Sequence, residues 1–292
     1  MAQKPWHTIQ CGEQMTQTQE AVWQSHSAQW SLVGAPLRPS PCDGSLMLEL
    51  LATTFARRPA GCAIAVLGVT PEVVQLAWPA GTRLHAFDCS EEMLAAVWAP
   101  NARVHSSVTQ AYWQALPLPA GQFDAVVGDG ALNALPSFAD YRAVLQELWR
   151  VTSPEAHLVL RCFVRPQLPD LLLSLKQAVR AGTIGSFHVL KWRLAMMLSD
   201  KTDGAVMVGA VYEMFEREFD RHELALTTGW PSQVIDTIDA YRAKPTVYTF
   251  PTFSQLAAIG EGLWAVEQVA TASYELASAC PTLRFKRLPA RA

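Results

Sequence analysis

The sequence lacks the cysteine patterns that bind metals or cross-link small secreted domains. Its six cysteines are scattered over 292 residues, without a Cys-x-x-Cys pair and without histidines at zinc-ligand spacing. This distribution argues against a metal site and against a disulfide framework. We expect reduced thiols that serve mostly as small apolar core residues.

Long runs of one residue type are also missing. No run of Lys or Arg exceeds two residues and the net charge is only −3, so no electrostatic footprint for nucleic acid is visible. The apolar stretches fall well short of the roughly 20 residues that span a bilayer. The start of the chain has a single early Lys4 before polar residues, and it has no apolar signal-peptide core. We therefore expect a cytoplasmic protein with a small-molecule substrate and with no nucleic acid or membrane partner.

What is present begins with apolar content. Half of the residues are hydrophobic, which is enough for one large domain with insertions or for two small ones. Residues 1–60 are predicted to form an N-terminal extension and a first helix, because the Gly and Pro residues within 34–39 enforce an extended connection. Asp43 is expected to cap that helix, and Pro59 and Gly61 to end it.

Residues 61–165 alternate between short continuous apolar runs and helical patterns. Such runs are typical of parallel strands that are buried on both faces. The five expected strands are 63–67, 84–87, 104–108, 123–127 and 157–161. This segment is predicted to be a Rossmann-like, cofactor-binding core.

The helices between these strands carry start signals. Thr70 suits an N-cap and Pro71 the first position of a helix that runs to about Trp78. Ser90 can cap a second helix, and a Ser-x-x-Asp capping box that starts at Ser137 can begin a third. Strands that alternate with helices imply right-handed crossovers and a parallel sheet.

Residues 166–250 change to a mainly helical pattern, which we interpret as an insertion that covers the substrate. Its aromatic and methionine side chains are compatible either with a core or with a pocket wall; they are Phe187, Trp192, Met196, Met197, Met207, Tyr212 and Phe215. Residues 251–292 are expected to add a closing helix with a capping box at Thr252 and Gln255, followed by strands at 263–269 and 283–288.

The complete pattern predicts an α/β fold. We expect a doubly wound, mostly parallel, seven-stranded sheet with helices on both faces, an N-terminal extension, and a helical insertion before the last two strands. Ligands of such sheets lie outside the carboxyl ends of the strands.

Two positions at that edge point to an adenosine-type cofactor. Gly68 follows the first strand, and Asp88, which ends the second strand about 20 residues later, is placed to meet a ribose diol. Asp88 can alternatively be an ordinary cap for the helix that starts near Ser90. The loop lacks the Gly-x-Gly-x-x-Gly fingerprint, since Thr70 and Glu72 stand at candidate glycine positions, and a carboxylate there competes with a pyrophosphate. This makes NAD and FAD improbable.

The motifs resemble those of class I S-adenosylmethionine-dependent methyltransferases of the small-molecule bacterial type. The resemblance covers residues 60–165 and the closing strands. It rests on the loop at 65–72, the acidic strand end at 87–93, the Leu-Pro-rich entry to the fourth strand at 116–127, and the helix end at 145–151. It implies a Rossmann-like fold, S-adenosyl-L-methionine as cofactor, and a cofactor site that contains Leu67, Gly68, Thr70, Glu72, Asp88, Cys89, Met93, Gly128 and Asp129.

The sequence departs from the family pattern at several points. Val66 replaces the usual acid inside the first strand, Glu155 and Ala156 replace a double glycine, and the acid that often follows the third strand is Tyr112 or absent. Asp129 can be a ligand-binding acid or a turn residue that caps the segment from Leu132 onward.

No catalytic residue is assigned from the sequence. Lone histidines such as His85 and His188 are more often structural than catalytic, and many methyl transfers need only alignment of the reactants. Three functions remain open. They are methyl transfer to an unidentified small molecule, a catalytically degenerate binding or regulatory protein of the same fold, and, with less support, a nicotinamide-dependent oxidoreductase.

Overall fold

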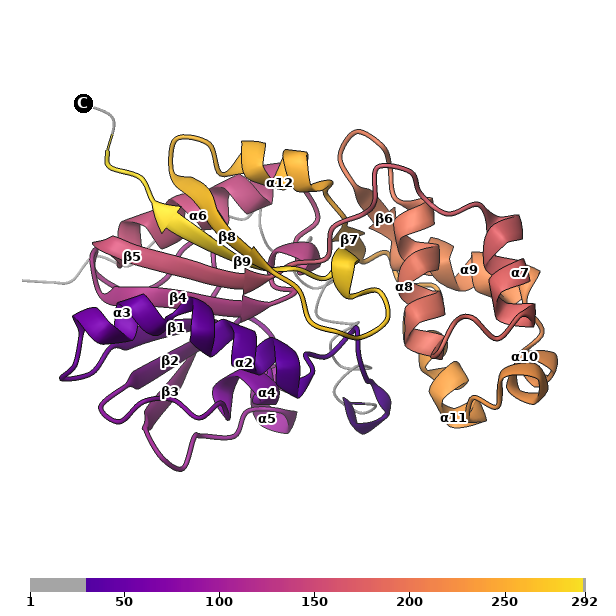
Figure 1. Cartoon of the computed structure of the whole chain (residues 1–292), viewed down its shortest axis with the longest axis horizontal. Helices are drawn as coiled ribbons and strands as arrows, with labels where there is room; N and C mark the ends of the chain where they lie inside the picture. Colours follow the sequence, from indigo (N-terminus) through magenta and orange to yellow (C-terminus); the bar gives the residue numbers. More distant parts are fainter. Residues whose placement is uncertain (1–29, 291–292) are drawn as a thin grey trace, which may run out of the picture.

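A computed structural model describes residues 30–290 of the chain (Figure 1). The first part of the expected N-terminal extension, with Lys4 and Cys11, lies outside these residues. The centre of the fold is a seven-stranded sheet in the order β3-β2-β1-β4-β5-β9-β8. The strands are β1 (Ala63–Leu67), β2 (Arg83–Asp88), β3 (His105–Gln110), β4 (Phe123–Asp129), β5 (Thr152–Arg161), β8 (Trp264–Ala270) and β9 (Thr282–Arg287).

Strands β1 to β5 are parallel, and β9 is antiparallel to both of its neighbours, β5 and β8. The predicted mostly parallel, seven-stranded sheet is therefore confirmed. Because side chains alternate along a strand, β1 sends Ala65 and Leu67 into one core and Ile64 and Val66 into another. Continuous apolar runs in the sequence arise from this burial on both faces.

Helices cover both faces of the sheet (Figure 1). One core contains apolar side chains of α6 (Phe138–Val151) and α12 (Phe253–Ile259). The opposite core contains those of α2 (Pro41–Leu50), α3 (Ala52–Arg57), α4 (Pro71–Val74) and α5 (Glu91–Ala96). The sheet is thus the middle layer of three.

Three of the expected helix starts are confirmed. Ser90 Oγ accepts a hydrogen bond from Met93 N at 3.2 Å and begins α5. Ser137 caps α6 through Asp140 N, and Thr252 caps α12 in a full capping box with Gln255. Each of these side chains accepts a hydrogen bond from a backbone N–H that has no partner within the helix.

Two expectations about helix ends are wrong. Ser40, and not Asp43, is the N-cap of α2; Asp43 is the third helical residue and accepts from Ser40 N at 2.7 Å in a capping box. Helix α4 ends at Val74 rather than near Trp78, and Thr70 occupies its N-cap position without a side-chain hydrogen bond. The side chains of Trp78 and Asn101 donate to the Val74 carbonyl at 3.2 and 2.9 Å, which replaces further helical hydrogen bonds.

Residues between β5 and α12 form a mainly helical segment beyond the carboxyl ends of β1, β4 and β5 (Figure 1). Its helices are α7 (Leu172–Arg180), α8 (Phe187–Leu198), α9 (Val208–Glu218), α10 (Arg221–Thr228), α11 (Ser232–Ile235) and the 3-10 helix η3 (Asp236–Tyr241). Two short antiparallel strands, β6 (Ala205–Met207) and β7 (Val247–Thr249), were not predicted.

This helical segment has a core of its own. Phe187, Trp192 and Phe215 are buried in it, so for these side chains the core interpretation is right. Met207, by contrast, is 55% exposed. Among residues 30–290, no helix is both long enough and apolar enough to cross a membrane.

Candidate functional site

The turn after β1 brings Gly68 against the end of β2. Gly68 has φ +85°, and its N–H donates to Phe87 O at 2.8 Å. A Cβ added to Gly68 would lie 3.7 Å from Asp88 Oδ2 and 3.9 Å from a ring carbon of Trp113. These three residues, here called the Gly68 cluster, therefore share one corner of the sheet edge, and the positive φ of Gly68 favours a residue without a Cβ there.

Asp88 is the charged member of the Gly68 cluster. Its Oδ1 accepts from Ser90 N at 2.9 Å, while Oδ2 is the oxygen nearest to Gly68. Burial raises the pKa of Asp88 to about 6, although hydrogen bonds from the Ser90 and Cys89 backbone oppose the shift. Ser90 itself supplies the cap of α5, and Asp88 supports the turn before it through the backbone hydrogen bonds from Ser90 and Cys89.

Trp113 is the aromatic member, and the sequence interpretation missed it. Its Nε1 donates to Phe87 O at 2.6 Å, which fixes the ring beside Gly68. The sequence interpretation considered Tyr112 at this point of the chain, but Tyr112 is 45% exposed. A tryptophan directly after the third strand was the available signal, because that strand end shares the ligand edge of the sheet.

The first turn of α4, just after the β1 loop, is held by residues 30–40, here called the N-terminal strap. Glu72 forms an ion pair with Arg38 of the strap. Arg38 also donates to Trp30 O at 2.7 Å and lies over the Trp30 ring, 4.9 Å from its centroid. Arg38 therefore ties the strap to the first turn of α4.

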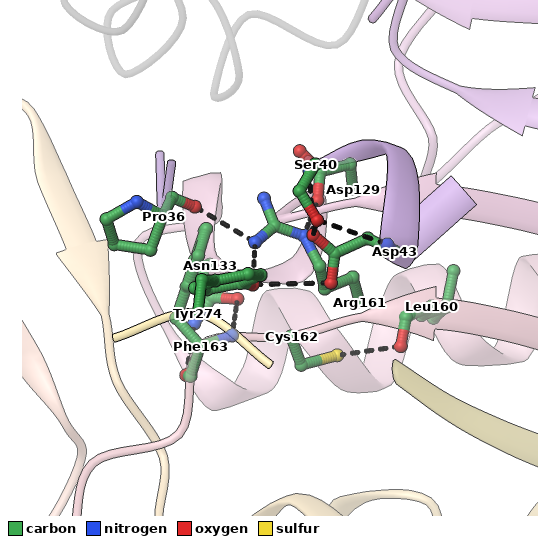
Figure 2. Close-up of polar contacts among 10 residues, drawn as sticks. All are labelled: Pro36, Ser40, Asp43, Asp129, Asn133, Leu160, Arg161, Cys162, Phe163 and Tyr274. Carbon is green, nitrogen blue, oxygen red and sulfur yellow. Dashed lines mark hydrogen bonds and ion pairs between the residues drawn. The ribbon is translucent and has the colours of Figure 1, made fainter. Parts of the chain in front are cut away.

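At the end of β4, Asp129 forms a buried ion pair with Arg161 of β5 (Figure 2). Burial raises the pKa of Asp129, and the Arg161 guanidinium opposes that shift. Arg161 Nη1 also donates to Pro36 O of the strap and to the Tyr274 hydroxyl, both at 2.9 Å. Tyr274 in turn donates to Asp43 at 3.3 Å. This network joins the strap, α2 and the loop before β9.

Asp129 thus has a protein partner that neither sequence interpretation anticipated. The 3-10 helix η2 (Leu132–Ala134) has Ala131 at its N-cap position with no side-chain hydrogen bond, so Asp129 does not cap it. Gly130 takes φ +59°, and an added Cβ there would lie 2.7 Å from the Phe163 ring. The turn after β4 therefore requires glycine for both conformation and space.

The other predicted site residues differ in how far their side chains are buried. The side chains of Leu67 and Met93 lie in the two sheet cores, with exposures of 1% and 4%. Cys89 is half-buried next to Asp88. Gly128, at the end of β4, approaches Leu67 and Leu160 closely. The side chains of Leu67 and Met93 therefore contribute to the packing of the sheet.

Comparisons with known proteins agree with this geometry. Residues 67–160 match the family model described as a methyltransferase domain. A search of curated proteins finds no match.

Solved structures share the fold over nearly the full chain. A proposed Zn-dependent alcohol dehydrogenase from Rhodobacter sphaeroides is 18% identical with TM-score 0.58, and the match covers 93% of this chain and 98% of that one. The CcbJ methyltransferase from Streptomyces caelestis is 13% identical with TM-score 0.55, over 93% and 99% of the two chains. A didemethyltoxoflavin N1-methyltransferase from Burkholderia thailandensis, with bound S-adenosylhomocysteine, is 11% identical with TM-score 0.51, over 98% and 94%.

At these identities the likeness concerns the fold alone, and the family model supplies the sequence evidence. Together they show a Rossmann-like fold of the kind found in S-adenosylmethionine-dependent methyltransferases, with a stretch at residues 67–160 whose sequence is similar to a methyltransferase domain. Among residues 30–290, no group of three or more His, Cys, Asp or Glu side chains is arranged to hold a metal ion.

Proposed function

We propose that the protein binds S-adenosyl-L-methionine and transfers its methyl group to a small-molecule acceptor. The observation that carries the proposal is the Gly68 cluster, in which a half-buried carboxylate, an indole ring and a glycine turn meet at the carboxyl ends of β1 and β2. A phosphate-free nucleoside suits these groups.

The residues of this corner fit an adenosyl group. Asp88 would accept hydrogen bonds from the ribose hydroxyls through the oxygen nearest to Gly68. Trp113 offers a flat apolar face to the adenine, as aromatic rings do for bases. The backbone of Leu67, Thr70, Cys89 and Gly128 would line the rest of the site.

The charges at the edge fit a cationic cofactor. Glu72 in the first turn of α4 and Asp129 at the end of β4 are acids near the Gly68 cluster, and each pairs with an arginine. Asp88 forms no ion pair within residues 30–290, so its carboxylate would meet a pyrophosphate unfavourably, whereas it would not repel a sulfonium or an ammonium.

When bound, the cofactor supplies an electrophilic methyl group on its sulfonium. The chain's own contribution is to bind, to orient and to exclude water. The helical segment lies at the strand ends, where it can cover an acceptor and hold it in line with the methyl group (Figure 1). We assign no catalytic base, since alignment alone supplies much of the acceleration.

Thermal-shift measurements with S-adenosylhomocysteine, S-adenosylmethionine and NAD test the proposal. A ligand at 100 times its dissociation constant adds about 2.7 kcal/mol to the native state, which corresponds to a rise of several degrees in Tm. We expect that rise with both adenosyl ligands and none with NAD. A rise with NAD alone would support the oxidoreductase, and no rise with any ligand would support the degenerate binding protein.

A further inference from the structure

Lys191 of α8 is a buried cation in the core of the helical segment, with an exposure of only 1%. Its Nζ lies 3.5 Å from Thr237 Oγ1, a long contact. The rings of Tyr241 and Phe187 lie 5.0 and 5.9 Å from the same nitrogen. Across residues 30–290, no carboxylate forms an ion pair with this amine. Burial lowers the pKa of Lys191 to about 7.

His188 lies three residues earlier on α8, and residues at this spacing are neighbours on one side of a helix. Its Nε2 is 2.9 Å from Leu32 O of the N-terminal strap. A carbonyl oxygen only accepts, so Nε2 carries the proton and Nδ1 is an acceptor. Within the described part of the chain, Nδ1 is buried and has no partner. Burial and the charge of Lys191 lower the pKa of His188 to about 4, which keeps the ring neutral.

The two residues together form a buried donor and a buried acceptor that the fold leaves incompletely satisfied. Unpaired polar groups destabilise a core, and a methionine at position 191 would fill similar space without that cost. Arg161 offers a contrast within the same molecule, because its guanidinium is equally buried but pairs with Asp129. Arg161 thus has an anionic partner, and Lys191 has none within residues 30–290.

We propose that Lys191 and His188 bind an acidic group of the methyl acceptor, either a carboxylate or a phenolate. The ammonium of Lys191 donates to the anionic oxygen, and His188 Nδ1 accepts from a hydroxyl or N–H of the same molecule. This inference rests on the proposed methyltransferase function and names the class of its substrate.

The position of α8 suits an acceptor site. Trp192, the residue after Lys191, packs edge-on against Phe163 with ring centroids 5.1 Å apart. Phe163 follows β5 and lies 5.0 Å below the Arg161 guanidinium at the strand ends. His188 reaches the strap, which also contacts Glu72 in the first turn of α4. His188 and Lys191 share one side of α8, and the strap that His188 contacts also reaches Arg161 at the end of β5, so an acceptor held by these two residues would lie between α8 and the strand ends.

The test uses acids and matched neutral compounds as probes. Benzoate is compared with benzamide, and 4-nitrophenol at pH 8 with 4-nitroanisole, by thermal shift and calorimetry with the full chain. Each titration is made with and without saturating S-adenosylhomocysteine, so that loss of acid binding and loss of cofactor binding are seen separately. We expect at least one acid to bind at least about tenfold more tightly than its neutral partner, because a hydrogen bond to a charged group contributes about that much affinity. The two pairs distinguish a carboxylate from a phenolate.

Lys191→Met is the decisive variant and Lys201→Met its matched control, because Lys201 is an exposed lysine of the same segment. The first should lose the preference for acids while keeping S-adenosylhomocysteine affinity within a few-fold, and the second should change neither. His188→Gln should weaken acid binding less than Lys191→Met. Equal binding of acids and neutral probes by the parent, or an unchanged preference in Lys191→Met, would overturn the inference.

Discussion

Two aspartates end the strands on either side of β1, and the fold treats them differently. Asp88, at the end of β2, gives one oxygen to a backbone N–H and turns the other toward Gly68 and Trp113. Asp129, at the end of β4, is bound by the buried Arg161, which also holds the strap. A carboxylate at a strand end is therefore not a ligand site by position alone. Its partner decides whether it is available to a ligand or supports the fold.

The largest effect should come from breaking the pair at β4. Replacing Arg161 by Met leaves Asp129 buried without its cation, which should lower the free energy of unfolding by about 3–5 kcal/mol. Urea unfolding of the parent and of Arg161→Met measures this loss. The double variant Arg161→Met with Asp129→Asn should recover much of it. A loss below about 1 kcal/mol would show that the pair does not hold the strap.

Removing the charge of Asp88 should have the opposite effect and stabilise the ligand-free protein. Its folded pKa of about 6 lies above its ordinary value of 3.8, so the parent loses stability as pH rises from about 4 to 6 and stays level above that. Asp88→Asn keeps the acceptor for Ser90 N and removes the charge. It should stabilise the ligand-free protein by about 1–3 kcal/mol above pH 6, and by little near pH 4. A destabilised variant at pH 7 would instead make Asp88 a structural cap.

Lys191 extends the comparison to the helical segment. Its folded pKa of about 7 lies below the ordinary 10.5, so the parent loses stability as pH falls from about 10 to 7 and then stays level. The neighbouring titratable groups are His188, which is neutral in this range, and Tyr241, whose pKa burial raises. Lys191→Met should therefore raise Tm by several degrees at pH 6.5 and by less at pH 9.5. Differential scanning calorimetry at both pH values checks this.

The sequence could predict the sheet because its signals are local. Apolar runs such as the one at Ala63–Leu67 and caps such as Ser90 depend on neighbours within a few residues. Asp43 was assigned the wrong position because a capping box presents two candidate caps, Ser40 and Asp43, and only geometry separates them. Strands β6 and β7 have three residues each, too few to show an alternating pattern.

The site was predictable only in part, because its pairings cross strands. Asp129 and Arg161 are direct register partners of β4 and β5, but a register shift between Phe123 and Ala125 hides that alignment from the sequence. Gly68 and Asp88 could be proposed from the sequence although the turn is poor in glycine, because their spacing is set within one strand-helix-strand unit. Trp113 joins them through the fold of a third strand.

The smallest effect should come from the pair between Arg38 and Glu72. Both side chains are partly exposed, at 22% and 26%, and such pairs contribute about 0–1 kcal/mol. Arg38→Gln should therefore change the free energy of unfolding by less than about 1 kcal/mol, which urea titration can measure beside Arg161→Met. A loss as large as that of Arg161→Met would mean that the two strap anchors act as one unit.

Calorimetric titration of S-adenosylhomocysteine into the parent and into Asp88→Asn tests the central claim most directly. Hydrogen bonds from ribose hydroxyls to a charged acceptor contribute about 1.5–3 kcal/mol, so we expect affinity to fall about 10- to 100-fold in a variant that is at least as stable as the parent. Equal affinity in the two proteins, or no binding to the parent, would contradict the assignment of Asp88 and its corner of the sheet to an adenosyl cofactor.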